Sequence, residues 1–134
     1  AFGFEYLGGL APCELCLWQR WPHAGVIIFC LMGTTGALRS GPALLMIALC
    51  AAVTAIIASY HLGVEQQLWQ GPTSCSGALT SMSASDLLDS LLATPVVRCD
   101  EIAWSFANIS MAGWNMLFSS GLACFALLAY RKTK

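Results

Sequence analysis

Cys13 and Cys16 are the residues whose type and spacing are best suited to redox chemistry. They lie in the stretch PCELCLWQR, immediately before a long apolar segment. Two thiols at this spacing can close into a disulfide and reopen by thiol exchange. The same spacing also occurs in structural disulfides and in one half of a metal site. Taken alone, the spacing leaves all three interpretations open.

The residues that follow Cys16 favour a reactive pair. If residues 13 to 20 are helical, Cys13, Cys16 and Arg20 lie at positions i, i+3 and i+7, on one face of the helix. A nearby guanidinium and a helix N-terminus both favour thiolate over thiol, and thiolate is the form that attacks disulfides. Arg20 could instead be an interfacial anchor. Pro22 predicts that the helix starts or kinks at that residue.

The seven cysteines divide by their position relative to the apolar segments. Three lie inside these segments, where a thiol usually acts as a small hydrophobic group, so we predict no redox role for Cys30, Cys50 and Cys124. Outside these segments lie four cysteines: Cys13, Cys16, Cys75 and Cys99. An even number of cysteines in an oxidising compartment predicts disulfides. Four cysteines allow three pairings, and the sequence does not choose among them.

A zinc site is the competing interpretation of the four outer cysteines. Structural zinc sites usually use two closely spaced pairs, whereas here only Cys13 and Cys16 are close in sequence. We therefore predict no metal.

The composition predicts an all-α integral membrane protein. Hydrophobic residues make up 57% of the 134 residues and charged residues 10%, and the net charge of -1 offers no basic surface for nucleic acid. Three segments contain almost no charge and predict spanning helices at residues 23–38, 42–62 and 109–130, of which the first is short for a span.

The basic residues predict the orientation of these spans. Four of the six occur at Arg39 and within residues 131–134, so the turn at residues 39–41 and this tail should face the cytoplasm. Residues 1–22 and the loop of residues 63–108 then lie outside.

The outer loop contains two further features. The stretch GPTSCSG is rich in turn-forming residues and predicts an exposed Cys75. Farther along, Ser83 and Asp86 resemble a capping box ahead of leucines at helical spacing, which predicts a short helix lying flat in the membrane interface and ending at Pro95. The leucines could instead pack on the protein's own outer loops.

His61 closes the second predicted span, four residues before Glu65. A histidine there could donate a hydrogen bond to a quinone carbonyl or carry protons, but polar residues at helix ends often simply face the membrane interface. At the other end of the outer region, residues 1–6 resemble the tail of a further apolar helix that ends at Gly8 and Gly9.

Four features occur in a fixed order along the chain. They are PCELCLWQR, YHLGVE at the end of the second span, the separated Cys75 and Cys99, and SMAGWN at the start of the last span. Together they resemble the bacterial disulfide bond formation protein B (DsbB) family over nearly the whole chain. The resemblance implies a four-helix bundle, here three spans plus the tail of a missing first helix. It also implies an enzyme of the bacterial inner membrane whose redox loops face the periplasm.

The resemblance implies a role for each outer cysteine. Cys13 and Cys16 match the quinone-coupled pair, with Cys16 next to the quinone ring and Cys13 exchanging with the other loop. Cys75 matches the cysteine that forms a mixed disulfide with a DsbA-like, thioredoxin-fold thiol oxidase of the periplasm, and Cys99 matches its resolving partner.

Arg20 and His61 match residues of the family's quinone site, and the quinone would be ubiquinone or menaquinone. Two other functions remain open at this point. One is a thiol and quinone oxidoreductase like the vitamin K epoxide reductase-like proteins. The other is a non-enzymatic membrane subunit with structural disulfides, although the spans lack the charged residues that ion pathways usually need.

Overall fold

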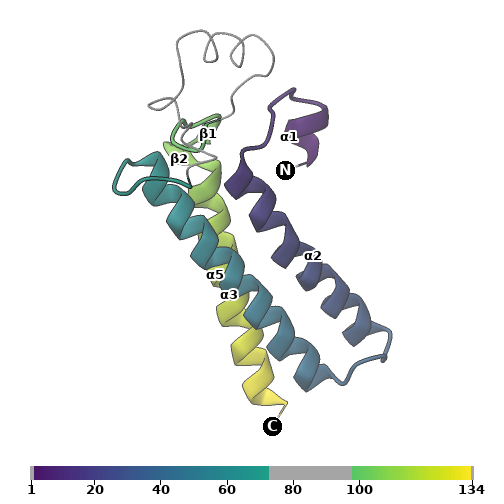
Figure 1. Cartoon of the computed structure of the whole chain (residues 1–134). Coiled ribbons are helices and arrows are strands. Elements are labelled where there is room, and N and C mark those ends of the chain that lie inside the picture. Colours follow the sequence, from purple (N-terminus) through teal and green to yellow (C-terminus); the bar gives the residue numbers. More distant parts are fainter. Residues whose placement is uncertain (1, 73–97, 134) are drawn as a thin grey trace, which may run out of the picture.

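The computed structural model describes residues 2–72 and 98–133. Cys75 and the predicted interfacial helix lie outside the described residues. The elements, in chain order, are α1 (Phe2–Tyr6), α2 (Glu14–Thr34), α3 (Ser40–Glu65), β1 (Ser105–Phe106), β2 (Ile109–Ser110) and α5 (Met111–Lys132). The long helices α2, α3 and α5 run side by side, and the short strands β1 and β2 lie at one end of them (Figure 1).

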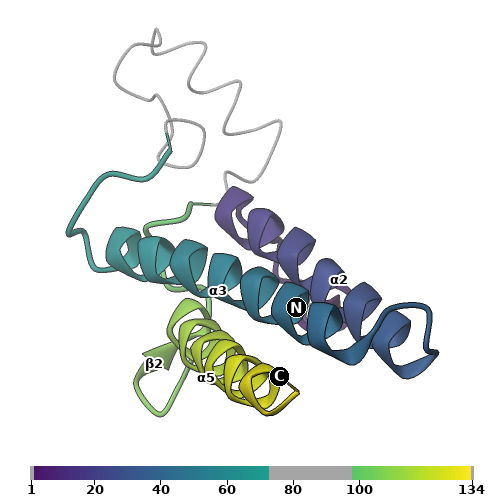
Figure 2. The ribbon, with the colours of Figure 1, turned by 90° about the horizontal axis from the view of Figure 1, so that it is seen from below.

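The described part of the chain is mostly helical, as predicted, and two of its helices are long and apolar enough to cross a membrane. These are α3 and α5, which contain the second and third predicted spans except for residues 109 and 110. The assignment of α2 as a span stays a prediction. Seen from below in Figure 2, α3 lies between α2 and α5, and it packs against both.

Helix α2 begins earlier than its apolar segment. Cys13 is the N-cap residue, and its sulfur accepts a hydrogen bond from the backbone N–H of Cys16 at 3.3 Å. Such a cap satisfies one of the N–H groups that a helix start leaves without a partner. The helix then continues through Pro22. Of the two effects predicted for this proline, a helix start or a kink, the helix start is therefore wrong. Both cysteines therefore lie at the N-terminus of a helix.

Small residues bring the three helices close together. The fully or nearly fully buried positions include Ala51 and Ala58 on α3 and Ala126 on α5, while large side chains such as Ile56 and Phe125 face outward. Small residues at the interface and large apolar residues outside are typical of helices that pack within lipid.

Replacing Ala58 by leucine should destabilise the bundle. Ala58 is 0% exposed, so the added atoms would have to displace neighbouring side chains or the helix backbone. We expect a loss of about 1–3 kcal/mol in stability, measured as a lower thermal midpoint in detergent. Ala24→Leu on the exposed side of α2 is the matched control and should leave the midpoint nearly unchanged.

A small hairpin ahead of α5 was not predicted from the sequence. β1 and β2 are antiparallel, with Phe106 opposite Ile109, and the two turn residues Ala107 and Asn108 have φ of 51° and 61°. Two successive positive φ values suit the tight turn of a two-residue hairpin. The hairpin leads directly into Ser110, the N-cap of α5, whose hydroxyl accepts from the Gly113 N–H at 3.1 Å.

Candidate redox site

The start of α2, the end of α3 and the start of α5 lie at the same end of the molecule (Figure 1). Here the sulfurs of Cys13 and Cys16 are 2.7 Å apart, and both cysteines are free thiols. Cys13 is buried, with 6% of its surface exposed, while Cys16 is partly exposed. The structure thus brings the predicted pair together, with Cys16 as its more accessible member.

Cys13, Cys16 and His61 are also a possible set of metal ligands, because their ligand atoms all lie within 4.8 Å of one another. Zinc bonds to sulfur at about 2.3 Å, which separates two sulfurs of a tetrahedral site by about 3.8 Å. The observed 2.7 Å is much shorter and closer to the disulfide length of about 2.05 Å. The spacing of the sulfurs therefore suits disulfide formation better than a shared ion.

His61 contacts the dithiol directly. Its side chain is buried, with its Nε2 at 3.6 Å from the sulfur of Cys13 and its Nδ1 at 3.1 Å from Nε2 of Gln19. The carboxylate of Glu65, one turn later on α3, lies 3.9 Å from His61 Nε2. Of the alternatives that the sequence left open for His61, a residue facing the membrane interface is wrong.

This contact is extended into the bundle by three polar residues: Gln19, Asn115 and Ser119. The sequence had not singled out any of them as part of the site. The Asn115 amide donates to Gln19 Oε1, and Ser119 donates to Asn115 Oδ1 at 3.1 Å. Gln19 and Ser119 are buried. An amide within an apolar span was the available signal, because such a group is expensive in lipid unless it is hydrogen-bonded.

Arg20 is held at the outer end of α2 by residues of α1. Its Nη2 is 2.6 Å from the carboxylate of Glu5, and its guanidinium lies 4.6 Å from the centre of the Phe2 ring. Its Nε is buried and has no hydrogen-bond partner among the described residues. Within the part of the chain that the structure describes, this N–H donor of Arg20 therefore has no acceptor.

The two thiols share one proton unequally. Both precede residue 23, where the predicted span begins. The hydrogen bond from the Cys13 thiol lowers the pKa of Cys16 to about 7, despite burial and the negative charge of Glu65, and Arg20 adds a smaller lowering. The same hydrogen bond, together with burial, raises the pKa of Cys13. Cys16 is thus the thiol of the reduced pair that ionises first, with a pKa near neutral pH.

This difference predicts the pH dependence of alkylation at Cys16. Because its pKa is lowered to about 7, the thiolate is present above that pH and lost below it. The rate with iodoacetamide should rise about tenfold between about pH 6 and about pH 8 and then level off. In Cys13→Ala the donor is gone, so the rate should still be rising at about pH 8. Mass spectrometry of the Cys16 peptide measures both rates, and identical profiles would contradict the shared proton.

Cys99 lies against the same centre. It is 1% exposed and packs in one buried cluster with Cys13, Leu15 and Val64. Its backbone also forms a hydrogen bond with His61, and its sulfur is disulfide-bonded. A disulfide of the outer loop is thereby anchored beside the Cys13 and Cys16 pair. The other predicted member of this group, Cys75, lies outside the described residues.

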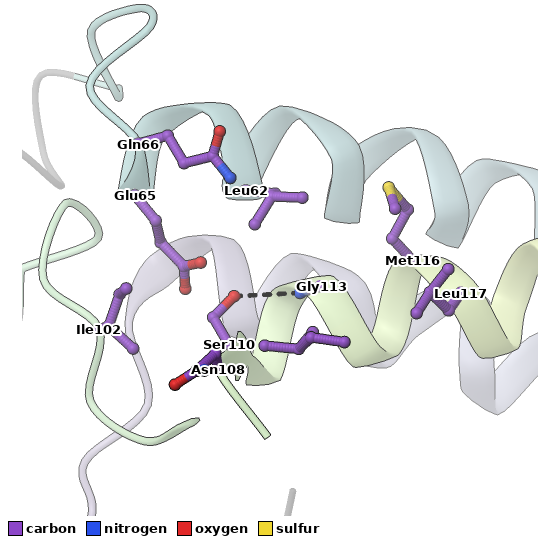
Figure 3. Close-up of a pocket in the computed structure, with 10 residues that line it drawn as sticks. Leu62, Glu65, Gln66, Ile102, Asn108, Ser110, Gly113, Met116 and Leu117 are labelled. Atoms are coloured by element: carbon purple, nitrogen blue, oxygen red, sulfur yellow. Dashed lines mark hydrogen bonds between the residues drawn. The ribbon is translucent and has the colours of Figure 1, made fainter. Parts of the chain in front are cut away.

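A cavity of about 280 Å³ opens on the other side of this end, between α3 and α5. Figure 3 shows the Glu65 side chain pointing toward Ser110, with Leu62 and Met116 along the same cavity. Cys16, Arg20 and His61 do not line it. Glu65 therefore lies between the redox centre and this cavity, and the cavity itself is separate from the exposed side of Cys16.

Comparisons with known proteins agree on one family. The family model for disulfide bond formation protein DsbB matches residues 1–129. A disulfide bond formation protein B of Xanthomonas axonopodis pv. citri is 30% identical over 134 residues, covering 94% of this chain and 77% of that protein. The corresponding protein of Xanthomonas campestris pv. campestris is 31% identical, covering 90% and 74%.

A further relative is disulfide bond formation protein B 2 of Pseudomonas savastanoi pv. phaseolicola. It is 31% identical, with 95% of this chain and 76% of that protein covered. No solved structure matches the chain significantly. With the dithiol at the N-terminus of α2, two helices long and apolar enough to cross a membrane, and a family match over nearly its full length, this chain belongs to the DsbB family of membrane disulfide bond formation proteins.

Proposed function

We propose that this protein reoxidises a DsbA-like thiol oxidase of the periplasm and passes the electrons through two cysteine pairs to a membrane quinone. The observation that carries this proposal is the position of the disulfide-bonded Cys99 in the same buried cluster as Cys13. Two redox-active pairs in contact can exchange electrons by thiol chemistry without any further carrier.

The first step is exchange with the soluble partner. A thiolate of the reduced partner attacks Cys75 of a Cys75 and Cys99 disulfide, forming a mixed disulfide and releasing Cys99 as thiolate. The second thiolate of the partner then attacks the partner's first cysteine sulfur in the mixed disulfide, and Cys75 leaves as thiolate. The partner leaves oxidised, and Cys75 and Cys99 are left reduced with the two electrons.

The second step passes these electrons to the other pair. A thiolate of the loop attacks Cys13 of the Cys13 and Cys16 disulfide, because Cys13 is the sulfur in the buried cluster with Cys99. Cys16 leaves as thiolate, and its lowered pKa of about 7 makes it the better leaving group. A second attack closes the loop disulfide and leaves Cys13 and Cys16 reduced.

The residues around Cys16 fit a quinone headgroup. When bound, a quinone supplies an acceptor for two electrons and two protons. Cys16 is the partly exposed sulfur, and Arg20 offers a buried N–H donor that has no partner among the residues the structure describes. A cation at this position would bind a carbonyl oxygen and stabilise the negative charge that develops on it. Cys16 would give up the electron pair, and the disulfide with Cys13 would form.

Replacing Arg20 by alanine should weaken the use of quinone while preserving thiol exchange. The variant loses the free Nε donor and the positive charge next to Cys16. We expect the quinone KM to rise by about tenfold or more. Arg98→Ala is the matched control, because Arg98 pairs with Asp100 on the outer loop. An unchanged quinone KM would make Arg20 a structural anchor for Glu5.

We also propose that the cell inner membrane holds the protein, with the redox end facing the periplasm. The basic residues at Arg39 and within residues 131–134 support this orientation, because loops rich in lysine and arginine stay in the cytoplasm. In the structure, the α2–α3 turn and the C-terminal end of α5 lie at the end of the bundle opposite the start of α2 (Figure 1).

The function is tested by anaerobic mixing of the protein, a reduced thiol oxidase of the DsbA type and an oxidised quinone. Quinol formation is followed optically while the disulfide of the oxidase is counted by thiol labelling. We expect equal amounts of quinol and oxidised partner, and no quinol without the protein. Oxidation of the partner with no quinol formed would refute the proposed route.

A further inference from the structure

A continuous chain of polar side chains crosses the bundle and ends at the dithiol. It starts at Ser119 on α5, passes through Asn115 to Gln19 on α2, and reaches His61 on α3. From His61 the chain continues to Cys13 and then to Cys16. Three helices thus contribute to one connected set of hydrogen bonds.

The direction of each hydrogen bond in this chain follows from the chemistry of the groups. An amide has distinct donor and acceptor ends, and the Asn115 NH₂ group donates to Gln19 Oε1. The opposite end of the Gln19 amide, its NH₂ group, therefore faces His61 Nδ1 at 3.1 Å. Because an NH₂ group can only donate, His61 Nδ1 has to accept and cannot carry a proton.

A neutral histidine that accepts at Nδ1 carries its proton on Nε2. This nitrogen lies 3.6 Å from the sulfur of Cys13. An N–H group cannot accept the thiol proton of Cys13, so His61 in this form is not a base for Cys13. All donors from Ser119 onward then point toward Cys16.

We propose that Gln19 and Asn115 are positioning residues that fix His61 in its Nε2–H form and so prevent it from acting as a base toward the Cys13 thiol. In this arrangement His61 is a donor to Cys13 and not the base that takes its proton. The inference rests on the proposed function only for its consequence, which is that the buried Cys13 is not activated in competition with the more exposed Cys16.

Burial makes the arrangement costly to reverse. Gln19 is 7% exposed, His61 4% and Ser119 4%. If Gln19 alone rotated its amide, a donor would face the Asn115 donor and an acceptor would face the His61 acceptor, with no water to compensate. The donor-to-acceptor direction is thereby fixed by all the hydrogen bonds from Ser119 to His61 together and not by a single contact.

Of the other groups around His61, the nearest carboxylate agrees with a proton on Nε2. The Glu65 carboxylate is 3.9 Å from Nε2 and attracts an N–H there. The backbone of Cys99 also hydrogen-bonds the ring. On the dithiol side, Arg20 favours and Glu65 disfavours a thiolate at Cys16, but both act more weakly than the hydrogen bond from Cys13.

The imidazole ¹⁵N spectrum of the reduced protein tests the tautomer without quinone or partner. It should be recorded at about pH 8, where histidine is neutral. The chain has two histidines, and a His61→Gln variant identifies their signals. His23 is an internal reference of the opposite form, because its Nδ1 donates to the Gln19 carbonyl at 2.9 Å. We expect His61 to be protonated on Nε2, and a proton on Nδ1 in the native protein would overturn the proposal.

Gln19→Glu should reverse the polarity with almost no change in shape. A carboxylate accepts from His61 Nδ1, so the proton moves to Nδ1 and Nε2 becomes an acceptor for the Cys13 thiol. Brief alkylation followed by mass spectrometry should then show the ratio of modified Cys13 to modified Cys16 rising by about fivefold or more. Gln70→Glu, an exposed glutamine of the outer loop, is the charge-matched control and should leave this ratio unchanged.

Asn115→Leu provides a second variant in case Gln19→Glu does not fold. It removes the donor that orients Gln19, so both tautomers of His61 should appear in the spectrum. An unchanged spectrum and an unchanged alkylation ratio in the folded variants would show that the polar chain is only structural. Because these measurements need only the reduced protein, they stay informative even if quinone proves not to be the acceptor.

Discussion

Cys16→Ser should abolish quinol formation, lowering turnover by at least about three orders of magnitude. A hydroxyl cannot form a disulfide with Cys13 and is not ionised at neutral pH, so neither the leaving group of the thiol exchange nor the electron donor remains. We assign this double role to Cys16 because it is the partly exposed member of the pair and its pKa is lowered to about 7.

The matched control for this variant is Cys30→Ser. Cys30 is a free cysteine on α2, inside the first predicted span, and we predict no redox role for it. Its variant should keep native turnover. Turnover that persists in Cys16→Ser would rule out the proposed electron route, whereas loss in both variants would indicate a general sensitivity of α2 to serine.

Cys99→Ala should trap the soluble partner as a covalent complex. Without Cys99 the loop disulfide cannot re-form, and the mixed disulfide between Cys75 and the partner loses the thiol that would resolve it from the membrane side. We expect a band of the summed mass on a non-reducing gel that disappears with dithiothreitol. The partner should carry a single exchanging cysteine, activated beforehand as a mixed disulfide with thionitrobenzoate. The free Cys75 thiol then attacks that sulfur and displaces thionitrobenzoate, and the partner has no second thiol with which to release itself.

Cys124→Ala, a free cysteine of α5, is the control and should give no such band. Peptide mapping decides which cysteine holds the partner. A complex through Cys75 supports the assigned roles, and a complex through Cys13 would mean that the partner reaches the buried pair directly. Absence of any complex would remove Cys75 from its proposed role.

The sequence could predict the features that depend on local composition. The charge-free segments located α3 and α5, since long apolar helices are set by the thickness of the bilayer. The sequence left open whether residues 13 to 20 are helical or a helix starts at Pro22, and in the structure α2 begins at Glu14 with Cys13 as its N-cap. Pro22 was less informative, because a proline within a helix removes one hydrogen bond without always ending the helix.

Contacts between distant residues could not be predicted from one sequence. The Asn115 and Gln19 amides are 96 positions apart, and the contact of His61 with Cys13 depends on how α3 packs against α2. The pairing of Arg20 with Glu5 has the same origin. The hairpin of β1 and β2 was not predicted, because two-residue strands leave almost no periodic pattern in the sequence.

The central claim is that the dithiol at the start of α2 reduces quinone directly. The most direct measurement is a rapid anaerobic quench of the fully reduced protein with quinone, in which quinol is quantified and the cysteines are identified by mass spectrometry. We predict equimolar quinol and a new disulfide between Cys13 and Cys16. Quinol formed while Cys13 and Cys16 both remain alkylatable would contradict the claim.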